Sequence, residues 1–143
     1  MILEPNLTGV PVPQPTPLSK PYWDGCAIGE LRYQRCTDCG AASFGPAHAC
    51  HRCRGRSLEW TAGTGRGAVY SWTIVGRPPL AAFVAPYAPC IVRLDEGYDM
   101  VSALVGIDPA ELERIGDGLR VQVEFHPVAD SITLPFFAPA DRR

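Results

Sequence analysis

A chain of 143 residues with a formal net charge of −2 has room for one domain or two small modules, and it lacks the charge that would attract nucleic acid or anionic membranes. Its composition, 46% hydrophobic and 20% charged, is that of a soluble globular protein, and its apolar stretches are too short to span a membrane. Fifteen prolines and fourteen glycines predict many turns and short strands.

The first 18 residues form a proline-rich arm. Its prolines alternate from Pro11 to Pro17, a spacing that favours extended backbone and excludes a regular helix. Because the arm has little apolar surface to bury, we expect either a disordered tail or a segment that lies on a partner. The N-terminus has no basic region and no apolar run, so a signal peptide is not expected.

A short helix is expected from Lys20 to about Ile28. Ser19 offers an N-cap, and Pro21 falls in the first turn, where its missing N–H costs nothing. The helix has more apolar surface than two free turns can expose, so it must dock on the rest of the chain, a ligand or a partner. That surface comes from Tyr22, Trp23 and Ile28.

Two Cys-x2-Cys pairs follow, Cys36 with Cys39 and Cys50 with Cys53. Their spacing allows four thiolates to surround one Zn²⁺ ion at about 2.3 Å per sulfur. With four protein ligands such a site is closed, so its role is structural. Since zinc thiolates need a reducing compartment, the cytoplasm is the expected location.

The alternative is a disulfide framework, which six cysteines would allow in a secreted protein. Nothing else in the chain is typical of secretion, and four thiolates make His48 and His51 unnecessary as ligands. Gly40 suits the turn after the first pair, whereas the glycine after the second pair comes one place late, at Gly55. The remaining cysteines, Cys26 and Cys90, are expected to be packed core thiols.

The hydrophobic pattern around and beyond the metal motif predicts a mostly β protein. Residues 31–35 and 58–61 read as strands that enter and leave the zinc ribbon, and the glycines at 63, 65 and 67 read as a hinge. The second module then shows three strands, a helix and two strands, the order of a five-stranded OB-fold barrel. The expected elements span 67–75, 89–94, 100–105, a helix over 109–115 capped by Asp108, 119–126 with a solvated His126, and 132–137.

This pattern divides the chain into four parts: the arm, a helix and rubredoxin-like zinc ribbon, an OB-fold domain and a short tail. The boundaries are 1–18, 19–64, 65–138 and 139–143. OB barrels bind ligands through the face of strands 2 and 3 and the loops after strands 1 and 4. Here the loop at 76–88 is long and apolar, so it either folds over the open end of its own barrel or lines a hydrophobic channel or a subunit interface. Phe83 and Tyr87 are the aromatic candidates for such a contact.

A zinc ribbon beside an OB barrel also suggests nucleic-acid binding. Charge argues against it, because residues 67–143 hold six arginines against ten acidic residues. The ribbon arginines could still contact one compact anion. No catalytic triad and no glycine-rich phosphate loop is present, so the chain is not expected to be an enzyme on its own.

The ordered motifs of this chain resemble those of a family of small zinc-ribbon plus OB-fold proteins, long described as a domain of unknown function. The resemblance covers nearly the whole chain beyond residue 18. Each motif is weak alone, and together they form a fairly specific set. They are Pro21-Tyr22-Trp23, LRYQRCTDCG, CHRC, GAVYSWTIV, Pro86-Tyr87, VRLDEG and IGDGLRVQVEF.

The resemblance implies a role that the residues alone leave open. Such proteins form complexes with thiolase-superfamily enzymes, including lipid-transfer-protein-like aldolases that cleave steroid side chains, or accompany hydratases of the hot-dog fold. It implies a non-catalytic subunit that helps bind the partner's acyl-CoA substrate, in a hetero-oligomer that binds neither nucleic acid nor membrane. In this chain Tyr22, Trp23, Trp72 and Tyr87 would then border the CoA path.

Overall fold

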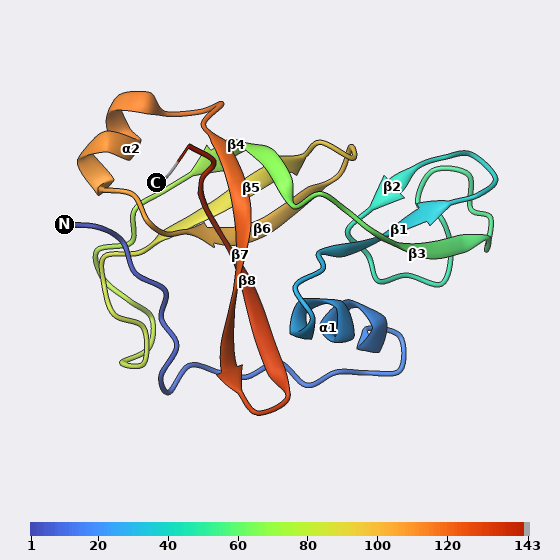
Figure 1. Ribbon diagram of the computed structural model, residues 1–143, viewed down its shortest axis with the longest axis horizontal. Helices are drawn as coiled ribbons and strands as arrows, with labels where there is room; N and C mark the ends of the chain where they lie inside the picture. Colours follow the sequence, from blue (N-terminus) through green and yellow to red (C-terminus); the bar gives the residue numbers. More distant parts are fainter. Residues whose placement is uncertain (142–143) are drawn as a thin grey trace.

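The computed structural model describes residues 1–141 as a small three-stranded ribbon beside a closed β-barrel (Figure 1). The ribbon has the strand order β2-β1-β3, and the barrel has the order β4-β5-β6-β8-β7. The elements are α1 (Lys20–Ala27), β1 (Arg32–Cys36), β2 (Ala42–Ser43), β3 (Leu58–Ala62), β4 (Arg66–Trp72), β5 (Ala88–Leu94), β6 (Asp99–Leu104), α2 (Pro109–Ile115), β7 (Arg120–Ala129) and β8 (Ile132–Pro139).

The barrel confirms the expected OB-fold order of three strands, a helix and two strands. All its strand pairs are antiparallel except β6 with β8, which meet in parallel at Leu104 and Phe137. Helix α2, between β6 and β7, starts as predicted. Pro109 occupies its first turn, and the Asp108 carboxylate accepts a hydrogen bond from Ala110 N at 2.8 Å.

The hairpin of β7 and β8 is longer than predicted and reaches α1 (Figure 1). Its length changes the environment of His126, which was expected to be solvated. The ring of His126 is half-buried, lies edge-on to Phe136 with 5.6 Å between centroids, and has its Nε2 3.3 Å from a carboxylate oxygen of Glu124. The predicted wet face of this strand is therefore partly covered.

Helix α1 docks through one face only. Tyr22, Gly25 and Cys26 are buried, whereas Ile28, which was expected to dock with them, is 66% exposed. The reason is that the helix ends at Ala27, so Ile28 lies in the turn that leads into the ribbon and points away from the docked face.

The proline-rich arm lies along its own barrel (Figure 1), an outcome that differs from both sequence-based expectations. Leu3 is 3% exposed; its N–H donates to Ile107 O at 2.9 Å, and its carbonyl accepts from Gly106 N at 2.8 Å. The terminal ammonium of Met1 lies 2.6 Å from the Asp108 carboxylate. The contact of Leu3 with the barrel could not be predicted from the sequence, because a single buried leucine gives no periodic pattern.

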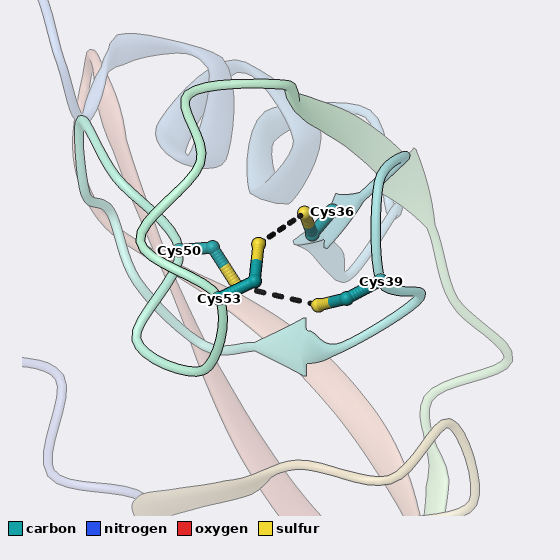
Figure 2. A group of neighbouring side chains, drawn as sticks. All are labelled: Cys36, Cys39, Cys50 and Cys53. Carbon is teal, nitrogen blue, oxygen red and sulfur yellow. Dashed lines mark hydrogen bonds between the residues drawn. The ribbon is translucent and has the colours of Figure 1, made fainter.

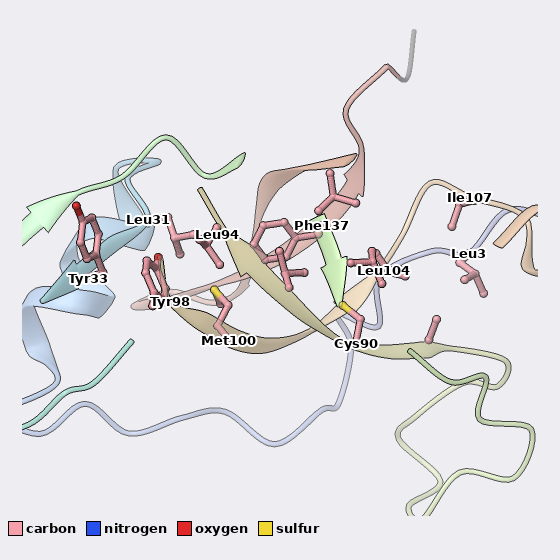
Figure 3. Close-up of a cluster of buried hydrophobic side chains, with 14 of the residues drawn as sticks. Leu3, Leu31, Tyr33, Cys90, Leu94, Tyr98, Met100, Leu104, Ile107 and Phe137 are labelled. Atoms are coloured by element: carbon pink, nitrogen blue, oxygen red, sulfur yellow. The ribbon is translucent and has the colours of Figure 1, made fainter. Parts of the chain in front are cut away.

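One hydrophobic core runs through both modules (Figure 3). Leu31 and Tyr33 of the ribbon are continuous with Phe137 of the barrel and with Leu3 of the arm. The expected glycine hinge is fixed by packing: Thr64 N donates to Glu96 Oε2 at 2.9 Å, and any Cβ at Gly65 would collide with the Val123 side chain. Glycine is needed there for close approach and for a φ of +71°, so it does not provide flexibility.

Candidate metal centre and apolar face

Four cysteine side chains converge at the tip of the ribbon (Figure 2). The Sγ atoms of Cys36, Cys39, Cys50 and Cys53 all lie within 4.8 Å of one another. Two of these pairs, Cys36 with Cys53 and Cys39 with Cys50, are 3.6 Å apart. Ligands about 2.3 Å from a tetrahedral Zn²⁺ ion lie about 3.8 Å from each other, so the donor set and its geometry fit zinc.

Each knuckle turns its backbone back toward the sulfurs. In the first, Gly40 has a φ of +78° and donates its N–H to Cys36 O at 2.8 Å. In the second, Arg54 takes the equivalent place with a φ of +64° and donates to Cys50 O at 3.0 Å. Arg54 therefore adopts the left-handed conformation that glycine adopts in the first knuckle. This explains why the glycine of the second knuckle comes one place later, at Gly55, where its N–H donates to Cys53 Sγ.

Backbone N–H groups stabilise thiolates in the second knuckle. Gly55 N donates to Cys53 Sγ at 3.3 Å, and Arg52 N donates to Cys50 Sγ at 3.4 Å. Hydrogen bonds from the backbone of Cys53 and Arg52 lower the pKa of the Cys50 thiol to about 6. At Cys53 the hydrogen bond from Gly55 N also favours the thiolate, but hydrogen bonds with the neighbouring cysteine sulfurs raise the pKa of that thiol overall. Because metals bind the thiolate form, Cys50 is the sulfur that the backbone prepares for a cation.

The other candidate ligands and thiols lie outside this cluster. His48 and His51 are exposed, and the group of possible ligands contains cysteines alone within residues 1–141. Cys26 and Cys90 are 1% and 3% exposed in the main core, as expected. Burial is the largest influence on both and raises the pKa of Cys26 to about 11 and of Cys90 to about 12.

Aromatic rings connect the ribbon, α1 and the barrel. Tyr22 lies edge-on to Trp23 at 5.0 Å and to Phe44 at 5.4 Å between centroids. Phe44 is in turn stacked with Tyr98 at 6.4 Å. Sequence reasoning missed Phe44 and Tyr98, because one lies in the loop between the knuckles and the other in a hairpin turn, where no periodicity marks a buried ring.

The predicted contact residues fall into different settings. Tyr22 is 6% exposed and belongs to the core, so it offers little surface to a ligand. Trp23 is half-buried and lines a groove between α1 and the barrel. Phe83 and Tyr87 lie 5.8 Å apart between centroids and line a cavity beneath the arm. Trp72 borders a third hollow, against β5 and β6.

These hollows adjoin one another over the outer side of the barrel. The groove beside Trp23 and the cavity beside Phe83 share four lining residues, namely Ser102, Ala103, Leu134 and Phe136. The hollow at Trp72 shares Pro89 with the cavity and Val101 with the groove. Val101 is 70% exposed and lies opposite Ile91 in the β5–β6 register. We call this surface the apolar face.

The loop at 76–88 contributes both to the chain's own packing and to exposed surface. Phe83 and Tyr87 turn toward the cavity, whereas Leu80 and Val84 are 51% and 69% exposed. On the ribbon, three exposed arginines follow the third zinc ligand within the second knuckle, with no carboxylate in ion-pair distance among residues 1–141. They are Arg52, Arg54 and Arg56.

This architecture defines a four-cysteine zinc-ribbon protein with an OB-fold domain. Two family models match the chain: residues 23–59 match the rubredoxin-like zinc ribbon domain of ChsH2, and residues 60–126 match its C-terminal OB-fold domain. The chain therefore belongs to the ChsH2/DUF35 family, as the resemblance in its motifs predicted. Neither helix within residues 1–141 is long and apolar enough to cross a membrane.

Three curated relatives carry different descriptions. A DUF35 domain-containing scaffold protein of Methanothermobacter thermautotrophicus is 33% identical over 70% of this chain and 74% of its own length. A probable enoyl-CoA hydratase alpha subunit of Thermomonospora curvata is 35% identical over 83% of this chain. The 3-oxo-4,17-pregnadiene-20-carboxyl-CoA hydratase alpha subunit of Mycobacterium tuberculosis is 31% identical over 73% of it. The chain spans only 36% and 32% of those two hydratase subunits.

A solved structure matches the whole fold. The chain superposes on a component of the Ltp2-ChsH2(DUF35) aldolase with a TM-score of 0.78 and 30% identity, over 90% of this chain and 98% of that one. A DUF35 protein from Sulfolobus solfataricus, at 13% identity and a TM-score of 0.59, shares the fold.

Proposed function

We propose that the chain is a non-catalytic scaffold subunit that binds a thiolase-superfamily aldolase of the Ltp2 type and helps to bind its acyl-CoA substrate. The observation that carries this proposal is the match to the Ltp2-ChsH2(DUF35) aldolase, which extends over nearly all of the matched chain. The relative described as a scaffold protein supports the same role.

The surface of the molecule is consistent with such a partner. The apolar face exposes Val101 and adjoins Trp72 and Trp23. Tryptophan is enriched at the centres of protein interfaces. A monomer in water gains nothing from exposing such side chains. The unpaired ribbon arginines supply positive charge for the phosphates of CoA or for acidic residues of a partner.

In this proposal the four thiolates hold a structural Zn²⁺ ion. All four ligand positions are filled by protein, so the ion has no free site for substrate, and it stabilises a ribbon whose two-residue β2 strand could not fold alone. The ribbon in turn supports Phe44 against Tyr22 and thereby fixes the aromatic helix. Chemistry would take place in the partner.

The test is coexpression with the Ltp2-like thiolase of the same organism, followed by size-exclusion chromatography with light scattering. We expect co-elution as a hetero-oligomer. Trp72→Ala and Tyr87→Ala should weaken acyl-CoA binding or partner activity. Tyr70→Ala is the control, because this 53% exposed ring lies on the same strand as Trp72 outside the hollows that we describe. A chain that elutes as a monomer beside the thiolase overturns the proposal.

The hydratase relatives favour a second candidate partner, a hot-dog-fold enoyl-CoA hydratase. Coexpression with that enzyme, in parallel, distinguishes the two. Co-elution with the hydratase and not with the thiolase would assign the chain to hydration of an enoyl-CoA.

A further inference from the structure

The cavity beneath the arm lies outside the barrel interior and is formed by segments far apart in sequence. It has a volume of about 230 Å³. Val10 and Pro11 of the arm cover it, Phe83 and Tyr87 of the loop form one wall, and Leu134 and Phe136 of β8 form the floor. The floor belongs to a small hydrophobic cluster separate from the main core.

The chemistry of the lining selects an apolar occupant. Ser102 already donates its hydroxyl to Pro135 O at 3.1 Å, and the Asn6 side-chain oxygen accepts from Val84 N at 3.0 Å. Glu4 is exposed and is the single acidic or basic side chain among the lining residues, whose other polar side chains are Asn6, Tyr87 and Ser102. Because the floor and walls are apolar apart from the Tyr87 hydroxyl and the paired Ser102 hydroxyl, a polar ligand placed there would find few replacements for its hydrogen bonds to water.

The size and the rim of the cavity narrow the class of ligand further. Its volume is below the range of about 300–1,000 Å³ for sites of drug-sized ligands, which suits one straight acyl chain better than a fused ring system. At the rim, the Glu4 carboxylate repels a free fatty-acid carboxylate, whereas the amide N–H groups of Asn6 can donate to a neutral thioester carbonyl. A thioester is the acyl form that the proposed function supplies.

The part of the arm that covers the cavity can move away without unfolding of the protein. Leu3 anchors the arm through two backbone hydrogen bonds, and Asn6 holds it to the loop. Between Asn6 and Thr16 no hydrogen bond ties the arm to the rest of residues 1–141. Between Asn6 and Thr16 the arm is therefore held over the cavity by side-chain packing, including that of Val10 and Pro11, and these contacts can be exchanged for contacts with a ligand.

We propose that this cavity binds a single unbranched acyl chain presented as a neutral thioester, with residues 7–15 of the arm as its cover. The inference rests on the proposed function for the source of the thioester. Binding to the isolated chain needs no partner, however, so its failure is separable from a failure of complex formation.

The experiment is titration of the purified chain with octanoyl-N-acetylcysteamine, followed by calorimetry or by methyl chemical shifts. We expect saturable binding, weaker binding of free octanoate, and no binding of a steroid-acid thioester in the cavity. Ala103→Phe should fill the cavity and weaken binding by at least about tenfold, because the new ring takes the space in which methylene groups of the acyl chain would be buried.

Val101→Phe is the matched control, because it adds the same ring two residues away on the same strand and does not line this cavity. It should leave the affinity unchanged. Zinc content and circular dichroism should be unchanged in both variants. Absence of octanoyl-thioester binding, an unaffected Ala103→Phe variant, or equal losses in both variants would each overturn the proposal.

Discussion

Tyr98 of the barrel stacks on Tyr33 of the ribbon, with 5.1 Å between ring centroids and 21° between ring planes. The contact joins the two modules at their shared core, where the rings are 5% and 3% exposed. Burial raises the pKa of Tyr98, and its hydroxyl has no hydrogen-bond partner among the described residues. The ring of Tyr98 therefore stabilises the joint, whereas its hydroxyl does not.

This contrast makes the joint testable with two substitutions. Tyr98→Ala should lower the free energy of unfolding by about 3–5 kcal/mol, because it removes a buried ring and leaves a cavity. Tyr98→Phe should leave stability unchanged or raise it, because it removes a buried and unpaired hydroxyl. Urea denaturation at neutral pH measures both. A Tyr98→Phe variant as unstable as Tyr98→Ala would show that the hydroxyl is hydrogen-bonded.

Removal of one metal ligand should unfold the ribbon. Cys36→Ser replaces a fully buried sulfur at the end of β1, so we expect loss of bound zinc and a large drop in the thermal unfolding temperature. Elemental analysis of the purified protein gives the zinc content. Cys26→Ala, which lies outside the cluster, should keep one zinc per chain. Full zinc occupancy in Cys36→Ser would contradict the four-thiolate site.

Two thiols should be unreactive in the native protein. Since burial raises the pKa of Cys26 to about 11 and that of Cys90 to about 12, little thiolate exists at pH 8. Alkylation with iodoacetamide at pH 8, read by mass spectrometry, should leave both unmodified until denaturant is added. Rapid native modification of either residue would mean that its part of the core opens readily.

The sequence was most informative where a spacing rule is strict. Cysteine pairs separated by two intervening residues indicated the metal centre, and Asp108 before Pro109 indicated α2, because both depend on local geometry alone. Contacts between distant segments were not predictable in this way. Leu3 finds its partner more than 100 residues away, at Ile107, and Phe44 of the loop between the knuckles packs against Tyr22 of α1. Such pairings follow from the tertiary fold, and no local periodicity encodes them.

The apolar face shows a related limit. Val101 alternates with buried Met100 as in any half-buried strand, and this pattern gives no reason to expect an apolar residue to be exposed there. Instead, it lies opposite Ile91 on the surface. A sequence records that a residue is apolar but not whether its own chain or another covers it. The loop at 76–88 was ambiguous for the same reason.

The stability of the fold should fall at acid pH through paired carboxylates. Arg120 donates to Asp95 at 2.9 and 2.7 Å, and these hydrogen bonds hold the pKa of that carboxyl below its usual range. A carboxyl with a lower pKa in the folded state contributes stability that is present above its unfolded pKa, about 3.9, and lost as pH falls through the folded value. Asp95→Asn should therefore flatten the acid limb of a stability–pH profile measured by urea denaturation. An unchanged acid limb in Asp95→Asn would mean that solvent fully screens the ion pair between Arg120 and Asp95.

The arm offers two neighbouring residues with opposite exposure. Leu3 is 3% exposed in the main core, whereas Ile2 is 52% exposed. Leu3→Ala should lower the free energy of unfolding by about 2–5 kcal/mol and release the arm, because the lost side chain leaves a cavity beside Ile107. Ile2→Ala should change it by less than about 0.5 kcal/mol. Urea denaturation measures both, and hydrogen exchange at the amides of Leu3 and Gly106 reports whether the arm has detached. Equal effects of the two substitutions would mean that the arm does not hold the position described.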